Sequence, residues 1–200
     1  ESDNNLWNYK FTWNPRNVVL AGKGGAAMFI QEGTYKYIPY HKLFRRTEFL
    51  SIENKKYEAY ANRDSLKYRS VYGLEDIPTM YRGTIRKVGF SRAWNIFVQL
   101  GMTDDSYTIE DSENMSYRDF VNLFLAYSPS DSVELKLRSY LKIDQDDIMW
   151  EKLAELDLFN PKKKIGLSKA TPAQMLQKIL EDSWTLKEDD KDMIVMQHLF

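Results

Sequence analysis

The sequence contains no cysteine, which excludes disulfides, thiolate chemistry and cysteine-ligated zinc. It also has no apolar run that approaches the ~20 residues required to cross a bilayer. Its first ten residues lack the basic region and the apolar core of a signal peptide. Because the absence of cysteine fits a reducing compartment, we predict a cytoplasmic protein without a membrane partner.

An excess of charge of either sign is missing as well, since 28 Lys and Arg stand against 29 Asp and Glu, for a net charge of -1. Proteins that neutralise a phosphate backbone carry a basic excess, so we expect no nucleic-acid partner. Histidine is scarce: His41 and His198 lie far apart, and neither has metal-ligand spacing around it. We therefore predict no metal site.

A chain of 200 residues can bury a sizeable core without a disulfide or a metal. It starts without Met and stops inside the apolar run "MIVMQHLF", which is typical of a buried strand. We therefore expect residues 1–200 to be one domain excised from a longer protein.

The first half of the chain has the pattern of β structure. Residues 26–40 and 48–63 each predict a hairpin, the first turning at Glu32-Gly33-Thr34 and the second at Asn54-Lys55-Lys56, and residues 79–90 predict a further strand. Ahead of them, Asn14 as N-cap and Pro15 at the first helical position predict a short helix that ends at Gly22.

From Ser91 onward the apolar residues follow the helical period, and Thr171 to Gln174 form a capping box with Pro172 at the first helical position. The closing run again predicts a strand. The sequence therefore predicts an α+β fold, with a mixed or antiparallel sheet built from the first half and the last strand. The block of helices, residues about 91–185, is inserted on one side.

Two short motifs resemble ligand sites but fail in detail. Gly22, Gly24 and Ala27 match the G-x-G-x-x-A form of a dinucleotide fingerprint, yet a helix precedes them and a hairpin follows, so a loop at a helix end is the better interpretation. The acidic run from Asp144 to Asp147 lacks the glycine and glutamate of a calcium loop, and we expect it to cap a helix N-terminus.

The stretch from Tyr57 to Thr84 places Asn62, Arg63, Asp64 and Ser65 at a joint between two strands, followed by Arg82. Guanidinium groups recur where a carboxylate or phosphate is bound. Arg16, just inside a helix N-terminus, would also suit an anion, although pairing with a core carboxylate such as Asp64 is the alternative. His41 is either a group that titrates beside a bound anion or an ordinary surface histidine.

A W-x-P-R-x-V block at residues 13–18, the N-R-D-S block at 62–65 and an R-G-T block at 82–84 follow one another in order. Together they resemble the C-terminal substrate domain of the saccharopine dehydrogenase family, the L-glutamate-forming reductases, over essentially all 200 residues. This resemblance implies an oxidoreductase of lysine or polyamine metabolism that oxidises a secondary amine joining two amino acids. NAD or NADP would bind to an N-terminal Rossmann domain that is absent from this chain, so the fragment alone would hold no cofactor and be inactive.

The resemblance also implies where the polycarboxylate amino-acid substrate would bind. Arg16 matches the substrate-binding arginine of the family, and Asp64 would orient Arg63 or Arg16 by a bidentate pair. No residue is assigned as proton donor or acceptor. The full set of expected substrate-binding residues is Arg16, Ile38, Pro39, Tyr40, His41, Asn62, Arg63, Asp64 and Ser65.

This sequence has Asn17 and a glycine-rich "GKGG" where many members of the family differ, which leaves more than one function open. Saccharopine is the first substrate that we expect, and a carboxy-polyamine of the carboxynorspermidine type is the alternative. A further alternative is a non-catalytic dimerisation module. Five Trp and thirteen Tyr favour a partner surface, and we expect a homodimer.

Overall fold

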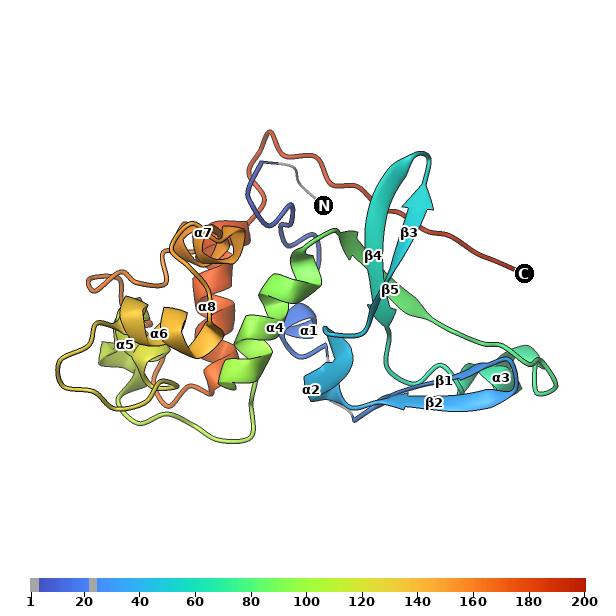
Figure 1. The fold of residues 1–200 in the computed structure, drawn as a ribbon, viewed down its shortest axis with the longest axis horizontal. Coiled ribbons are helices and arrows are strands. Elements are labelled where there is room, and N and C mark those ends of the chain that lie inside the picture. Colours follow the sequence, from blue (N-terminus) through green and yellow to red (C-terminus); the bar gives the residue numbers. More distant parts are fainter. Residues whose placement is uncertain (1–3, 22–24) are drawn as a thin grey trace. The chain divides into compact units, whose positions relative to one another are not determined.

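The computed structural model describes residues 4–21 and 25–200. The chain forms two compact units. We call Glu1–Leu20 with Ile96–Phe200 the helical unit, and Ala21–Asn95 the sheet unit. Helices and antiparallel strands are both present, which confirms the predicted α+β class (Figure 1).

The described part of the sheet unit holds two antiparallel sheets, of two and three strands. Both hairpins form where the sequence predicts them, because a two-residue turn with Gly or Asn joins each pair of strands. The first sheet is β1 (Ala27–Gln31) with β2 (Thr34–Ile38). The second, in spatial order, is β3 (Thr47–Ile52), β4 (Lys55–Ala61) and β5 (Gly83–Lys87), and the connections contain α2 (Tyr40–Leu43) and α3 (Tyr68–Tyr72).

A buried carboxylate connects the three-stranded sheet to the next helix. Glu58 lies on β4 and is only 4% exposed. Its two oxygens accept hydrogen bonds from the backbone N–H groups of Gly89 and Ser91, at 2.9 and 2.6 Å, where α4 (Phe90–Leu100) begins. A carboxylate at this end of a helix satisfies N–H groups that have no partner within the helix. Strand β4 therefore fixes the start of α4.

The helical unit follows the capping signals of the sequence. The side chain of Asn14 caps α1 (Pro15–Val19), and Thr171 and Gln174 form the expected capping box on α8 (Pro172–Trp184). Asp147 caps α7 (Ile148–Glu155), as expected for the acidic run. The remaining elements are the 3-10 helix η1 (Ser112–Asn114), α5 (Tyr117–Asn122) and α6 (Val133–Leu141).

Trp184, at the end of α8, is the centre of an aromatic cluster in the helical unit. Its ring makes edge contacts with Trp7, Tyr9 and Phe11 at centroid distances of 5.1, 5.3 and 5.4 Å. The backbone N–H of Phe11 donates to the Trp184 carbonyl at 2.9 Å. All four side chains are buried, and each such aromatic pair is worth about 0.5–1.5 kcal/mol beyond the burial of area. The cluster holds the N-terminal segment against α8.

Two details of the predicted sheet are wrong. The strands of the first half form two sheets instead of one, and the expected last strand at residues 193–200 is coil. Ile194 and Met196 in this run are 83% and 72% exposed. An apolar run becomes a strand only where another strand satisfies its backbone N–H and C=O groups. Within the described chain, this run is in neither sheet.

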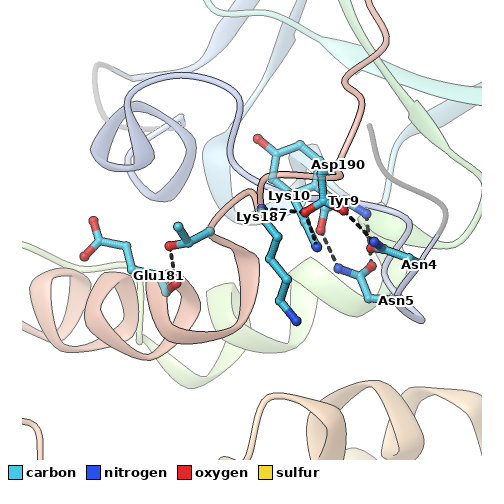
Figure 2. A network of polar contacts seen from close by, with 8 residues as sticks. Asn4, Asn5, Tyr9, Lys10, Glu181, Lys187 and Asp190 are labelled. Atoms are coloured by element: carbon cyan, nitrogen blue, oxygen red, sulfur yellow. Dashed lines mark hydrogen bonds and ion pairs between the residues drawn. The ribbon is translucent and has the colours of Figure 1, made fainter.

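A polar network around Asp190 joins residues from both ends of the helical unit (Figure 2). The ammonium group of Lys10 lies 2.5 Å from the carboxylate of Asp190, and the two side chains are 6% and 5% exposed. Asn4 Nδ2 and the backbone N–H of Lys187 also donate to this carboxylate, at 2.6 and 2.7 Å. These hydrogen bonds, that from Lys10 foremost, lower the pKa of Asp190 from 3.8 to about 2. The network ties the segment after α8 to the N-terminal segment.

The ion pair of Asp190 predicts a specific acid response. Because the pKa of Asp190 is lower in the folded chain, its contribution to stability is full above pH 3.8 and is lost as the pH falls toward about 2. Asp190→Asn should therefore lower the melting temperature at neutral pH and weaken its dependence on pH in that acidic window. Thermal melts from neutral pH down to about pH 2 measure this. Asp189→Asn, at the exposed neighbouring acid, is the control; equal acid responses in both variants would contradict the role of Asp190.

Candidate functional site

The candidate site is organised by β1, which is hydrogen-bonded along both of its edges. One edge pairs with β2, where Ala27 lies opposite Ile38. On the other edge, the N–H of Met28 donates to the Arg63 carbonyl at 2.9 Å, and the N–H of Ser65 donates to the Met28 carbonyl at 2.8 Å. The end of β2 and the N-R-D-S block therefore flank the same end of β1, about 10 Å apart by strand spacing.

Asp64 and Ser65 direct their side chains to the backbone. Asp64 Oδ1 accepts hydrogen bonds from the N–H groups of Leu66 and Lys67, at 2.9 and 3.3 Å, which is a capped turn. Ser65 is 1% exposed, and its Oγ accepts a hydrogen bond from the Arg82 N–H at 3.1 Å. The expected pair between Asp64 and Arg63 is therefore wrong. Nearby backbone N–H groups compete for the Asp64 carboxylate, and these donors, unlike the Arg63 side chain, need no ordering of a long side chain.

Arg63 occupies a strained backbone position and leaves much of its side chain exposed. Its φ of 49° lies in the left-handed region, which costs a non-glycine residue roughly 1–2 kcal/mol. The hydrogen bonds of Asn62, at 2.8 Å to Arg82, and of Ser65 hold the backbone on both sides of it. Its Nε donates to the Ala21 carbonyl at 3.3 Å. Strain that the surroundings enforce is typical of functional sites.

The other expected stretch differs in exposure from residue to residue. Ile38 is 7% exposed and is part of the core, so its side chain is turned away from solvent. Pro39 precedes α2, and the half-buried Tyr40 packs its ring edge-on against Phe44 at 6.1 Å. His41 is exposed. Pro39, Tyr40 and His41 are therefore the members of this stretch that can meet a ligand through their side chains.

Arg16 lies in the helical unit, and its side chain is 49% exposed. Its Nη2 pairs with Asp105 Oδ2 at 3.4 Å, so the carboxylate partner is Asp105 and not the Asp64 that we considered. The pair spans 89 positions, which is why no local pattern predicted it. The backbone N–H of Arg16 donates to the cap Asn14, so an anion could bind to Arg16 only through the guanidinium, which already pairs with Asp105.

The glycine of the R-G-T block has a steric reason. A Cβ at Gly83 would come within 2.8 Å of the Tyr81 ring and 3.4 Å of the Tyr60 carbonyl. Tyr81 packs edge-on against Phe29 at 5.0 Å, which joins this segment to β1. Burial, and then the charge of Glu48, raises the pKa of Tyr81 to about 12, so its hydroxyl is protonated at neutral pH.

The dinucleotide-like motif lies partly in the described residues. Gly22 and Gly24, in the motif that resembles a dinucleotide fingerprint and in the expected helix end, lie outside the described residues. Ala27 begins β1, so a hairpin does follow the motif.

Within residues 4–21 and 25–200, His, Asp and Glu side chains do not gather in groups of three that suit a metal ion. In the same residues, every helix is too short or too polar for a membrane span.

The fold has a counterpart among solved structures. It is similar to the solved apo saccharopine dehydrogenase (L-Glu forming) from Saccharomyces cerevisiae, with a TM-score of 0.76, 24% identity and coverage of 94% of this chain and 43% of that chain. The family model for the saccharopine dehydrogenase C-terminal domain matches residues 1–200. The chain therefore belongs to the saccharopine dehydrogenase C-terminal domain family, which confirms the resemblance of the sequence motifs.

Curated relatives agree with this assignment over the whole chain. The sequence is 27% identical to saccharopine dehydrogenase (NADP(+), L-glutamate-forming) of Schizosaccharomyces pombe, across 100% of this chain and 46% of that protein. It is 29% identical to the mitochondrial alpha-aminoadipic semialdehyde synthase of Rattus norvegicus, across 100% of this chain and 22% of that protein. The chain thus spans less than half the length of these relatives.

The capped turn at Asp64 predicts how this position responds to substitution. Asp64→Ala removes the acceptor for two backbone N–H groups and should lower the free energy of unfolding by about 1 kcal/mol. Asp64→Asn keeps the acceptor without its charge and should change the stability by only a few tenths of that amount. Urea unfolding of the two variants measures the difference. Equal losses would show that the charge of Asp64, and not its cap, is what the fold requires.

Proposed function

We propose that this chain is the substrate-binding part of an NAD(P)-dependent oxidoreductase that acts on saccharopine in lysine metabolism. The observation that carries the proposal is the meeting of two expected site stretches at one end of β1, with the strained, exposed Arg63 between its hydrogen-bonded neighbours. Membership of the family and the names of the curated relatives support the reaction class.

In such an enzyme, this chain would hold the substrate and another part would bind the nucleotide. The relatives from two yeasts are named as NADP(+) enzymes. The dinucleotide-like motif of this chain does not fit that cofactor, because Ala27 opens a strand where the fingerprint requires a helix. We therefore infer that residues 1–200 supply guanidinium and backbone donors for the substrate carboxylates and are inactive alone. The reacting carbon and nitrogen would be oriented by these contacts.

The alternative substrate and the cellular location are two further proposals. A carboxynorspermidine-type substrate is the alternative to saccharopine, and it would bring more amines and fewer carboxylates to the same site. The cytoplasm remains the predicted location. The relative from Rattus norvegicus is named as mitochondrial, which concerns that protein.

Arg16 gives the first test. In the whole protein that carries this chain, Arg16→Ala should raise the KM for saccharopine by roughly tenfold to a hundredfold, because a hydrogen bond to a charged group is worth about 1.5–3 kcal/mol. Stability should change little, since the side chain is half exposed. Steady-state kinetics that follow NADP reduction measure the change.

Asn17→Ala, at the exposed neighbouring position of α1, is the matched control for Arg16→Ala. Kinetic constants of Arg16→Ala that equal those of the parent would exclude Arg16 from substrate binding. Turnover of carboxynorspermidine in place of saccharopine would establish the alternative substrate.

Dimerisation is a second role, favoured by an apolar hollow on the three-stranded sheet. The hollow has a volume of about 460 Å³ and is lined by Phe49, Leu50, Ser51, Lys56 and Val88. Phe49 is 72% exposed and lies on β3, an edge strand with backbone groups available for pairing. We propose that a second copy of the protein covers this surface, since an exposed apolar patch at a sheet edge suits an isologous contact.

Substitution of Phe49 tests this role. Phe49→Lys should raise the dissociation constant of the dimer by about tenfold or more, because it places a charge in a surface that is desolvated on association. A tenfold change corresponds to about 1.4 kcal/mol. Light scattering over a concentration series measures the dissociation constant. Tyr127→Lys changes an aromatic side chain of the helical unit that is 92% exposed, and it serves as the control. A parent protein that is monomeric throughout would exclude the dimer.

A further inference from the structure

Arg82, in the R-G-T block, has a backbone that is fixed to the N-R-D-S block on both sides. Its N–H donates to Ser65 Oγ at 3.1 Å, and its carbonyl accepts the N–H of Asn62 at 2.8 Å. Ser65 is itself buried and held by Met28. Residue 82 therefore keeps a defined place beside the end of β1 where the proposed substrate site lies.

The side chain of Arg82 is also held, and in a way that leaves its hydrogen-bond donors unused. Its guanidinium carbon lies 4.1 Å from the centroid of the Tyr68 ring, and Tyr68 stacks on Tyr72 along α3 at 5.9 Å. Stacking on an aromatic face engages the flat side of a guanidinium and leaves the N–H groups at its edge free to bind. Among the described residues, none accepts a hydrogen bond from this guanidinium.

Arginines with a structural role in this chain donate hydrogen bonds from the guanidinium to acceptors within the protein. Arg118 forms a bidentate pair with Glu134. Arg69 donates from one end of its guanidinium to the Tyr35 hydroxyl at 3.0 Å and from the other to the Glu75 carbonyl. Arg82 is exposed and is ordered by stacking without such an acceptor. A guanidinium that stacks on a ring and has no acceptor among the described residues is suited to bidentate binding of a carboxylate, and the stacking reduces the entropy lost on binding.

We propose that Arg82 binds a carboxylate of the substrate and that Tyr68 positions it, an inference that rests on the function proposed above. Lys67 adds positive charge here, since its Nζ lies 5.2 Å from the centroid of the same Tyr68 ring. Ser65 then has a defined task, because its hydroxyl fixes the backbone from which Arg82 extends. The R-G-T block thereby becomes part of the substrate site.

Kinetics of the whole protein test this assignment, with saccharopine and NADP varied separately. Arg82→Ala should raise the KM for saccharopine by about tenfold or more and leave that for NADP unchanged. Arg82→Lys keeps the charge without the planar edge and should give a smaller rise. Tyr68→Leu removes the aromatic face and should also raise the KM for saccharopine, with little effect on kcat.

Two variants serve as matched controls for the loss of a ring or of a charge. Tyr68→Phe keeps the aromatic face and should reverse the rise in the KM for saccharopine that Tyr68→Leu causes. Lys55→Ala removes an exposed cation at the opposite end of β4, about 20 Å along the strand, and should have no effect. Circular dichroism melts of every variant separate a folding defect from a binding defect, and calorimetric titration of saccharopine gives its affinity directly.

Each outcome decides between this inference and the proposed function. An unchanged KM for saccharopine in Arg82→Ala, beside a raised one in Arg16→Ala, would overturn the role of Arg82 and leave the proposed function standing. A raised KM for NADP alone would overturn it as well, because the anion would then be a phosphate. A parent protein that neither binds nor oxidises saccharopine would overturn the proposed function itself, and this inference with it.

Discussion

Hydrogen bonding along both edges of β1 is the constraint on which the candidate site depends. A strand satisfies all of its backbone groups only when it has a neighbour on each side. β2 supplies one neighbour, and on the other side Met28 bonds with Arg63 and Ser65 while Ile30 bonds with Met80. Segments that are distant in sequence are therefore brought beside one strand, and the polar residues of the N-R-D-S and R-G-T blocks meet there because the backbone requires it.

Within the N-R-D-S block, the acceptors and the donors have separate tasks. Asp64 Oδ1 and Ser65 Oγ accept hydrogen bonds from backbone N–H groups, including that of Arg82. The guanidiniums of Arg63 and Arg82 remain exposed, and one of them extends from a strained backbone position. The sequence motif contains charges of both signs. In the structure, the hydrogen bonds that Asp64 and Ser65 accept form a turn, and the guanidiniums of Arg63 and the neighbouring Arg82 are exposed to solvent.

Features encoded by neighbouring residues were predictable from the sequence. The cap at Asn14, the capping box at Thr171 and the turn at Glu32 depend on contacts a few positions apart, and all three formed as expected. The final strand was wrong because a strand depends on a partner that an apolar run does not identify. The partners of Arg16 and Glu58, 89 and 31–33 positions away, arise from tertiary packing and leave no local pattern.

Electrostatics at this end of β1 bears on the choice of substrate. The exposed basic groups here are Arg63, Lys67 and Arg82, the exposed Glu48 lies near Tyr81, and Asp64 Oδ1 accepts hydrogen bonds from two backbone N–H groups. Guanidiniums remain protonated at any physiological pH, so an approaching ammonium group is repelled and a carboxylate is attracted. A carboxy-polyamine would bring several ammonium groups to this surface, whereas saccharopine would bring several carboxylates. In the function proposed above, these basic groups therefore favour the polycarboxylate over the polyamine.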